Sequence, residues 1–273
     1  MILPQKDKVA YSVRALSFLL FPHHLSFADV SKSSNTAAIK KVEAQVRKVL
    51  SEQISRSFES QKKEKVQKKM IQSWVADFFK SLPEIRQKLL KDAQSAADRD
   101  PAVESLDEVI MCYPGFQALM IYRLAHELAM KNIPFLPRMM SEMAHTQTGC
   151  DIHPGAKIGE GLFIDHATGV VIGQTAVIGN RVTIFQGVTL GAIAIQEKSS
   201  PKKRHPTIED DVILYSHATI LGGDTVIGKG AIIGGSCWIT FSVPPHSKVI
   251  LANPRSLLSQ SQKQIEQVPN WDI

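Results

Sequence analysis

The sequence has few cysteines and no long apolar run. Its three cysteines, Cys112, Cys150 and Cys237, are odd in number and widely spaced, which excludes a disulfide framework and the paired spacing of a zinc site. No stretch approaches the roughly 18 apolar residues that span a membrane. The short apolar run 15–21 has no small-residue cleavage site after it, so we predict a buried helix rather than a signal peptide. We expect a cytoplasmic protein with no membrane contact.

The sequence also lacks any excess of acidic residues, and its net charge is +6 over 273 residues. A basic balance can indicate a nucleic-acid partner. Here the basic residues gather between 62 and 91 at helical spacing, among acidic and apolar residues, and no nucleic-acid-binding motif accompanies them. The pattern favours a solvated helix face, and we predict no nucleic-acid partner.

Residues 1–145 have the apolar spacing of α-helices, with hydrophobic side chains every three or four positions. The segments that show this spacing most clearly are 66–79, 84–97, 115–131 and 138–145. Pro83 predicts a break between the first two, and Asp100 with Pro101 predicts the start of another helix. No catalytic motif is evident here, so we expect a domain for packing and self-association.

From Ile152 onward the chain repeats every six residues. Each step opens with an aliphatic residue, at positions Ile152, Ile158, Ile164, Ile172, Ile178, Ile184, Leu190, Ile208, Leu214, Ile220, Ile227, Ile233 and Ile239. This period fits neither an α-helix nor a single strand. It is the signature of a parallel β-helix, in which stacked coils bury the aliphatic side chains that one coil cannot bury alone.

The predicted fold class is therefore α+β. We expect an α-helical domain over 1–145, a parallel β-helix over 146–255 and a C-terminal tail over 256–273. The ladder is interrupted by a polar, charged insertion, 191–207. Repeat proteins often place binding loops at such insertions.

Several polar residues of the ladder could perform chemistry. Asp165 and His166 lie where a turn would expose them, and an imidazole is suited to proton abstraction near neutral pH. Asp151 lies about one coil below and could orient that imidazole. Arg204, followed by His205, could bind a carboxylate. Each also has a simpler explanation, as a surface residue or a member of a solvated loop, so spacing alone indicates only an acyltransferase-like scaffold.

The same region carries a series of motifs in fixed order. They are Asp151-Ile-His-Pro-Gly-Ala-Lys-Ile-Gly, Ile164-Asp-His-Ala-Thr-Gly, Gly173-Gln-Thr-Ala-Val, Gly187-Val-Thr-Leu-Gly, Lys203-Arg-His-Pro-Thr-Ile-Glu-Asp and Val243-Pro-Pro. Upstream lie Asp100-Pro-Ala-Val and Gly115-Phe-Gln-Ala-Leu-Met-Ile-Tyr-Arg. Together, over roughly residues 90–255, these motifs resemble the serine O-acetyltransferase family.

The resemblance implies transfer of acetyl from acetyl-CoA to the hydroxyl of L-serine, which commits serine to cysteine biosynthesis. It implies that His166 is the general base and Asp151 its partner. It also implies substrate-binding roles, with Asp100 and Asp165 contacting the ammonium, Arg204 the carboxylate, and His205 the substrate or the tetrahedral intermediate.

The family resemblance further implies a left-handed coil, trimers formed through the coils, and hexamers formed as dimers of trimers through the helical domains. The resemblance places the CoA arm in a groove between neighbouring coils of a trimer, over Gly191, Ala192, Ser216 and Gly235. No metal is expected. In some relatives a terminal isoleucine enters O-acetylserine sulfhydrylase, which makes Ile273 a possible contact for that partner.

Three positions depart from the family pattern. Gln174 stands where some members have Glu, the loop after Leu190 reads Gly-Ala-Ile-Ala-Ile and is lengthened, and Tyr215-Ser-His217 is bulkier than usual. Side-chain contacts to CoA in that loop are therefore left open.

Three alternatives also remain open. One is a related acetyltransferase acting on a sugar or another small acceptor. The second is a zinc β-helix of the carbonic-anhydrase kind, which requires three histidines to converge on one metal between subunits. Its candidates, His153, His166, His205 and His217, lack a tight paired spacing. The third is a catalytically silent scaffold, which the joint presence of Asp151, His166, Arg204 and His205 disfavours.

Overall fold

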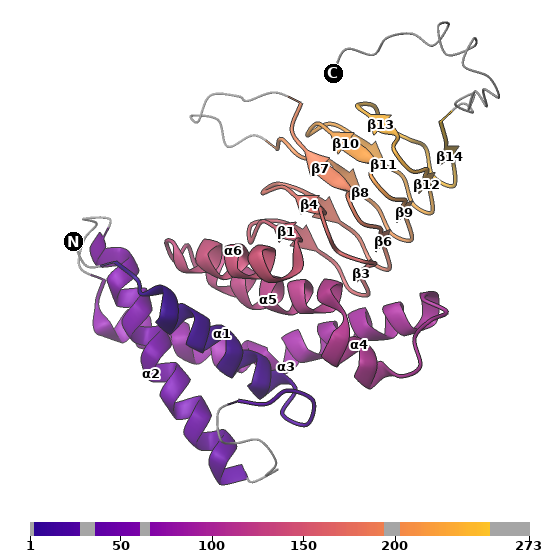
Figure 1. Ribbon diagram of the computed structural model, residues 1–273. Helices are drawn as coiled ribbons and strands as arrows, with labels where there is room; N and C mark the ends of the chain where they lie inside the picture. The colour runs from indigo at the N-terminus through magenta and orange to yellow at the C-terminus, as the bar shows by residue number, and fades with distance from the viewer. Residues whose placement is uncertain (1–2, 28–35, 61–65, 194–202, 252–273) are drawn as a thin grey trace, which may run out of the picture.

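The computed structural model describes residues 3–27, 36–60, 66–193 and 203–251 (Figure 1). Within these ranges the helices come first, and short strands follow as stacked coils that extend away from them. The predicted tail, 256–273, and most of the predicted insertion lie outside the described residues.

The helices pack around one continuous apolar core. They are α1 (Lys6–Leu20), α2 (Thr36–Ser60), α3 (Lys68–Arg99), α4 (Leu106–Cys112), α5 (Pro114–Ala129) and α6 (Leu136–Thr148). The apolar run 15–21 lies mostly in α1, and Leu16 and Phe18 are buried there, which confirms the predicted helix. None of the described helices combines the length and the apolarity that crossing a membrane requires.

Pro83 does not break a helix, and this prediction was wrong. The residue lies inside α3, which runs without interruption from Lys68 to Arg99. Proline inside a helix removes a backbone hydrogen bond and costs about 3 kcal/mol. Phe79 and Ile85, on either side of it, are buried in the same core. Burial of Phe79 and Ile85 in the core offsets the free-energy cost of Pro83 within the helix. Helix propensities, which describe single residues, do not include this contribution.

Asp100 ends a helix rather than starting one, which corrects a second prediction. It is the C-cap residue of α3, with extended backbone angles of φ −97° and ψ 109°. The next helix, α4, begins only at Leu106, where the hydroxyl of Ser105 accepts a hydrogen bond from the Glu108 N–H at 3.2 Å. Because Ser105 supplies the cap, the carboxylate of Asp100 is left available for other partners.

The strands form three parallel sheets that are the faces of a triangular coil. Their bounds are β1 (Asp151–Ile152), β2 (Lys157–Ile158), β3 (Phe163–Ile164), β4 (Val171–Ile172), β5 (Val177–Ile178), β6 (Thr183–Ile184), β7 (Thr189–Gly191), β8 (Thr207–Ile208), β9 (Ile213–Leu214), β10 (Thr219–Leu221), β11 (Val226–Ile227), β12 (Ile232–Ile233), β13 (Trp238–Ile239) and β14 (Lys248–Val249). Face A stacks β1-β4-β7-β10-β13, face B stacks β2-β5-β8-β11, and face C stacks β3-β6-β9-β12-β14.

The predicted ladder residues line the axis of this coil. All of them are buried except Ile158, which is partly buried and packs against the same core. The parallel register pairs Ile152 with Ile172 and Ile172 with Leu190, so aliphatic side chains of successive coils lie directly above one another. The prediction of a parallel β-helix from the six-residue period is confirmed.

Three columns of turns connect the faces. The first corner leads from face C to face A and contains residues 165–170. The second corner leads from face A to face B and contains 173–176, with the insertion one coil above. The third corner leads from face B to face C and contains 179–182.

A buried ion pair joins the helices to the first coil. Arg123 of α5 donates from Nε to Oδ2 of Asp92 at 2.6 Å and from Nη2 to Oδ1 at 2.8 Å. Asp92, on α3, also accepts from the Leu162 N–H at 3.0 Å, and Arg123 donates to the Gly159 carbonyl at 2.7 Å. The pair therefore links α3 and α5 to the turn before β3.

A second close contact lies beside it. A Cβ atom at Gly115 would lie 2.0 Å from the carbonyl oxygen of Ile164, so only glycine allows α5 to pack so closely on β3. Asp165 and His166 follow directly after β3. The start of α5 is thus held in register with the residues of the first corner.

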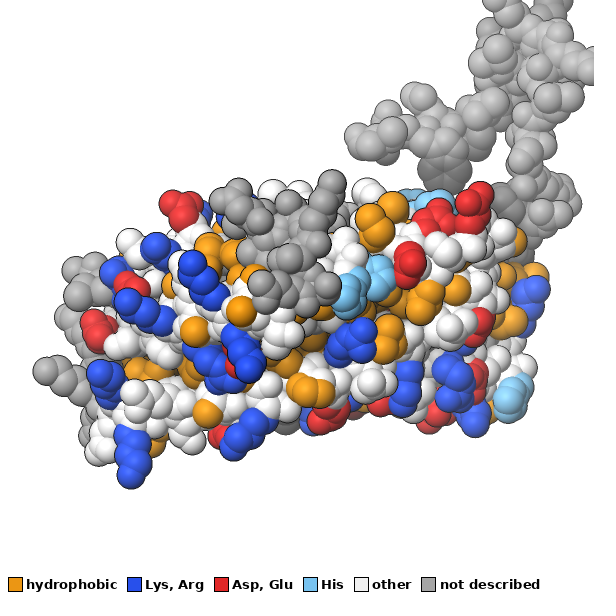
Figure 2. Space-filling model, turned by 90° about the horizontal axis from the view of Figure 1, so that it is seen from below, with side chains coloured by type: hydrophobic (Ala, Val, Ile, Leu, Met, Phe, Trp, Pro, Cys, Tyr) orange, Lys and Arg blue, Asp and Glu red, His pale blue; other side chains and the backbone are white. Residues whose placement is uncertain are grey.

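Several basic residues of α3 are paired with acids. Lys88 Nζ lies 2.8 Å from Glu84 Oε1, and Lys91 Nζ lies 2.5 Å from Glu160 Oε2. On the face drawn in Figure 2, Lys and Arg side chains are interspersed with acidic and apolar ones. This mixture is typical of a solvated helix face.

Candidate active site

The first corner presents His166 to solvent because it is enlarged. Asp151 pairs with Val171, twenty residues later, whereas Val171 pairs with Thr189, eighteen residues later. The two extra residues extend the turn, and both His166 (φ 58°) and Ala167 (φ 61°) adopt left-handed backbone conformations there. The imidazole of His166 is 70% exposed as a result.

Asp165 and Asp100 lie near His166, and Tyr113 contacts Asp100; we call these four residues the His166 cluster. His166 Nε2 lies 3.7 Å from Asp165 Oδ2. The Tyr113 hydroxyl donates to Asp100 Oδ2 at 2.6 Å, and the Ala102 N–H donates to Asp100 Oδ1 at 2.9 Å. Asp100 comes from the end of α3 and Tyr113 from the junction of α4 and α5, so the helices complete a site that begins on the coil.

The pKa values of the two carboxylates in this cluster are shifted in opposite directions. The hydrogen bond from Tyr113 lowers the pKa of Asp100, and the Ala102 N–H and the nearby His166 lower it further. Burial raises the pKa of Asp165, and the negative charge of Asp100 adds to that shift. The cluster therefore holds one firmly ionised carboxylate and one that accepts a proton more readily.

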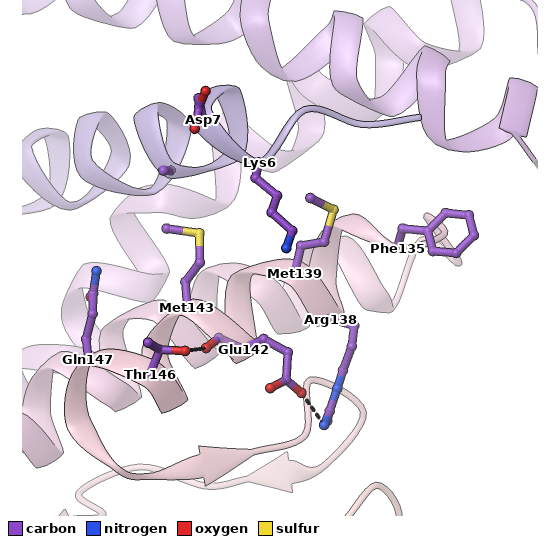
Figure 3. A pocket seen from close by; sticks show the side chains of 10 residues that line it. Lys6, Asp7, Phe135, Arg138, Met139, Glu142, Met143, Thr146 and Gln147 are labelled. Atoms are coloured by element: carbon purple, nitrogen blue, oxygen red, sulfur yellow. Dashed lines mark hydrogen bonds and ion pairs between the residues drawn. The ribbon is translucent and has the colours of Figure 1, made fainter. Parts of the chain in front are cut away.

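Asp151 lies at the same corner, one coil below His166. It begins β1, and its Oδ1 is buried, 3.7 Å from Arg138 Nη1 on α6. Arg138 also pairs with Glu142 along α6 (Figure 3). Among the described residues, no hydrogen bond or ion pair joins Asp151 to His166, so the predicted dyad stays a prediction.

Arg204 and His205 are held at the second corner by Gln174 and Thr175, and we call these four residues the Arg204 cluster. Arg204 donates from Nη2 to Gln174 Oε1 at 2.8 Å. The hydroxyl of Thr175 accepts hydrogen bonds from the N–H groups of Arg204 and His205, at 2.8 and 3.1 Å. The end of the insertion is thus fastened to the coil below.

The hydrogen bonds of His205 fix its tautomer. The Thr175 N–H donates to Nδ1 at 3.2 Å, so Nδ1 is an acceptor and the proton of the neutral ring lies on Nε2. Burial lowers the pKa of His205, with Arg204 and Lys203 adding to the effect. His205 is therefore a neutral hydrogen-bond donor through Nε2.

The ring of His205 lies directly over Gly173. A Cβ atom there would come within 1.9 Å of the ring Cδ2 and 2.1 Å of Nε2. His205 is predicted to contact the substrate, so we expect Gly173→Ala, which would displace the ring, to lower kcat/KM for serine acetylation on the order of 10- to 10²-fold. Steady-state kinetics of Gly173→Ala and His205→Ala, each compared with the unsubstituted protein, measures the effect. A Gly173→Ala protein with unchanged kcat/KM would contradict the prediction.

Within one chain the two clusters do not meet. The His166 cluster lies at the first corner and the Arg204 cluster at the second, and face A separates them. The histidines divide in the same way, with His166 and His217 at the first corner and His153 and His205 at the second. Each of these two corners of one chain therefore holds two of the four histidines, and among the described residues no group of three His, Cys, Asp or Glu side chains could hold a metal ion.

Comparison with known proteins identifies the family. A family model described as "Serine acetyltransferase, N-terminal" matches residues 31–121. A curated protein of Synechococcus elongatus, "Serine acetyltransferase, plasmid", is 40% identical over 267 residues, which cover 93% of this chain and 83% of that protein. The chain belongs to the serine acetyltransferase family.

Solved serine acetyltransferases share the architecture. Isoform 3 of Entamoeba histolytica, solved in complex with cysteine, aligns with a TM-score of 0.81 at 31% identity over 95% of this chain and 87% of that one. The Neisseria gonorrhoeae enzyme, solved in complex with serine, aligns with a TM-score of 0.60 at 26% identity over 88% and 95%. The predicted left-handed parallel β-helix after a helical region is thereby confirmed.

The residues predicted to contact CoA fall into two pairs. Ser216 and Gly235 stack at the first corner, where a Cβ on Gly235 would lie 3.1 Å from the Ser216 carbonyl oxygen. Gly191 and Ala192 lie at the opposite edge of face A. A cavity of about 510 Å³ adjoins Ala192 and is lined also by Lys203, Arg204, Gly222, Gly223 and neighbouring residues.

Two residues of the candidate site were not predicted from the sequence. Tyr113 follows Cys112 and precedes Pro114, and Pro at the first position of α5 marks it as a helix boundary but not as a partner of Asp100. Thr175 lies within the Gly173-Gln-Thr motif, and only the structure relates its hydroxyl to Arg204 and His205. Both act through contacts across more than ten residues of sequence.

Proposed function

We propose that this serine acetyltransferase transfers acetyl from acetyl-CoA to the hydroxyl of L-serine at a site built from the His166 and Arg204 clusters. The observation that carries the proposal is their charge. One cluster offers two carboxylates beside an exposed imidazole, and the other offers a guanidinium beside a neutral imidazole. A zwitterionic amino acid requires both signs of charge, with a base near its hydroxyl.

In this mechanism His166 takes the proton of the serine hydroxyl as the oxygen attacks the thioester carbonyl carbon. The resulting tetrahedral intermediate collapses, its carbon–sulfur bond breaks, and the imidazolium returns the proton to the departing CoA thiolate. Asp100 and Asp165 bind the serine ammonium, and Arg204 binds its carboxylate. Asp151 orients the imidazole from the coil below, and general-base assistance of this kind contributes roughly 10²–10⁴-fold.

The negative charge of the tetrahedral oxygen needs a donor. His205 is suited to that role because its Nδ1 is occupied by the Thr175 N–H and its proton lies on Nε2. It is also suited because its pKa is lowered by burial, so it donates without carrying a full charge. The cavity beside Ala192, with Lys203 and Arg204 at its edge, is the proposed entry for the CoA arm.

A complete site requires a second chain in this proposal. The two clusters lie at different corners of one coil, whereas a threefold ring would bring the first corner of one chain beside the second corner of its neighbour. We therefore propose a trimer formed through residues 146–255, with the helical residues 1–145 serving packing and association of trimers. The predicted sulfhydrylase contact depends on Ile273, which lies outside the described residues.

The substrate is tested by measuring free CoA thiol released from acetyl-CoA in the presence of different acceptors. We expect release with L-serine and much slower release with glucosamine, a galactoside or a chloramphenicol-type acceptor. Faster release with a sugar than with serine would overturn the proposal.

The shared site is tested by mixing two defective chains. We expect Arg204→Ala to raise the KM for serine on the order of 10²-fold, because it removes a charge-assisted contact, and to raise the KM for acetyl-CoA less, although Arg204 also lines the proposed CoA entry. His166→Ala should abolish most turnover. Co-expressing the Arg204→Ala and His166→Ala chains in equal amounts should make about a quarter of the sites active. In those sites an intact His166 from one chain meets an intact Arg204 from its neighbour.

The matched control is co-expression of the His166→Ala chain with a chain that carries both His166→Ala and Arg204→Ala. No site of that mixture has an intact His166, so its activity should stay at the level of His166→Ala alone. Activity of the first mixture equal to the sum of its separate components would show that each site lies within one chain.

A further inference from the structure

Tyr113 occupies a position that the reaction described above does not explain. It is the C-cap residue of α4 and also the N-cap residue of α5, which begins at Pro114. Its N–H donates to the Val109 carbonyl at 3.2 Å, and its carbonyl accepts from the Gln117 N–H at 3.0 Å. The backbone of Tyr113 is therefore fixed by two helices at once.

The same backbone is fixed relative to the first corner. Gly115, two residues later, packs on the Ile164 carbonyl so closely that no Cβ would fit. Ile164 directly precedes Asp165 and His166. The distance between the Tyr113 ring and the predicted base is thus set by a rigid backbone contact rather than by a flexible loop.

The side chain of Tyr113 ends on Asp100. Its hydroxyl donates to Oδ2 at 2.6 Å, while the Ala102 N–H holds Oδ1 at 2.9 Å. Each carboxylate oxygen thus has one fixed donor and retains further acceptor capacity. Without the tyrosine, the carboxylate would be held only by the turn that follows α3, and its second oxygen would be free to rotate.

We propose that Tyr113 is a positioning residue, which fixes the Asp100 carboxylate beside His166 so that it accepts the ammonium group of serine. This inference rests on the proposed role of Asp100 in substrate binding. Tyr113 acts through Asp100 and does not serve as a base, since burial and the hydrogen bond to Asp100 raise the pKa of its hydroxyl.

The charged groups around Asp100 make the effect of Tyr113 on serine binding depend on pH. The titratable groups that face Asp100 and Tyr113 are Glu108 of α4 and Asp165 and His166 of the first corner. The hydrogen bond from Tyr113 is the largest cause of the lowered pKa of Asp100. Removing it raises that pKa, so a larger fraction of Asp100 is protonated as the pH falls, and serine binding weakens on the acid side.

The test compares Tyr113→Phe with Tyr11→Phe, which removes a hydroxyl from α1 where the ring packs on Phe27. We expect Tyr113→Phe to raise the KM for serine on the order of 10-fold, with kcat and the KM for acetyl-CoA nearly unchanged. The ratio of the serine dissociation constants of the two variants, measured by calorimetric titration, should increase as the pH is lowered from about 6 to about 4, because only there does the pH approach 3.8, the ordinary pKa of an aspartate. A purely structural role would give a ratio that is independent of pH.

Asp100→Asn separates this inference from the proposal beneath it. If Asp100→Asn leaves the KM for serine unchanged, the role assigned to Asp100 is wrong. If Asp100→Asn raises that KM while Tyr113→Phe behaves like Tyr11→Phe at every pH, Asp100 binds serine without help and the inference about Tyr113 is overturned. Thermal melts of all three variants identify any that fail to fold, and a Tyr113→Trp variant then replaces an unfolded Tyr113→Phe.

Discussion

Replacing His166 with alanine is expected to lower kcat roughly 10²- to 10⁴-fold, the contribution typical of a positioned general base. The enlarged first corner leaves this imidazole 70% exposed, with Asp165 Oδ2 3.7 Å from Nε2, so the side chain can reach a substrate that binds outside the coil. The affinity for CoA should change little, because no CoA contact is assigned to His166. Stopped assays of thiol release, combined with calorimetric titration of CoA, measure the two effects separately.

His246 provides the matched control. It lies at a turn of the same coil, with a left-handed backbone (φ 57°) like that of His166 (φ 58°), but at the third corner. His246→Ala should therefore impose the same change of backbone preference without loss of turnover. Turnover of His166→Ala within a factor of about two of His246→Ala would remove His166 from the role of base.

The coil could be predicted because its physics is local and repetitive. One aliphatic side chain per six residues must reach the axis, and each register pair, such as Ile172 with Leu190, repeats the same requirement. The extra pair of residues before Ile172 was also visible in the sequence. The prediction that a turn exposes the side chains there is confirmed for His166, which is 70% exposed, and wrong for Asp165, which is 17% exposed.

The helical region was harder to predict because its boundaries depend on tertiary contacts. Pro83 is tolerated within α3 through the burial of the residues around it. Asp100 ends that helix because it precedes Pro101, which disfavours helical backbone angles at the residue before it. The hydrogen bond from Tyr113 to Asp100 joins residues 13 positions apart, a spacing that neither the helical period nor the six-residue period predicts. A sequence pattern can suggest such residues singly, but it contains no information about which of them meet.

The division of the site between corners was also beyond the sequence. Arg204 follows a long insertion, and hydrogen bonds to Gln174 and Thr175 set its position. These two residues lie 30 and 29 positions earlier in the sequence, on the coil below. The six-residue period reports which residues face the axis, but it does not report which corner of a neighbouring chain they approach.

The second large effect is expected for stability. Asp92→Ala should lower the free energy of unfolding by about 3–5 kcal/mol, because it leaves the guanidinium of Arg123 buried without its partner. The side chains of Asp92 and Arg123 are 0% and 5% exposed, and the Leu162 N–H also loses its acceptor. Urea unfolding at one fixed protein concentration, needed because association contributes to stability, measures the loss.

The surface pair Arg47–Glu43 serves as the control. These side chains are both 38% exposed, and Glu43→Ala should cost no more than about 1 kcal/mol. Replacing Asp92 with Leu together with Arg123 with Met should cost less than Asp92→Ala alone, since it removes both charges. An Asp92→Ala loss as small as that of Glu43→Ala would show that the buried pair does not hold the helices on the coil.

This pair also bears on the site itself. Asp92 and Asp100 lie on the same helix, and Arg123 and Gly115 lie on the next helix that contacts the coil. Weakening the pair frees α3 and α5 to shift relative to β3, and the Asp100 carboxylate then moves relative to His166. We therefore expect the KM for serine of Asp92→Ala to rise even under conditions where the protein stays folded, whereas a change confined to stability would leave it unaltered.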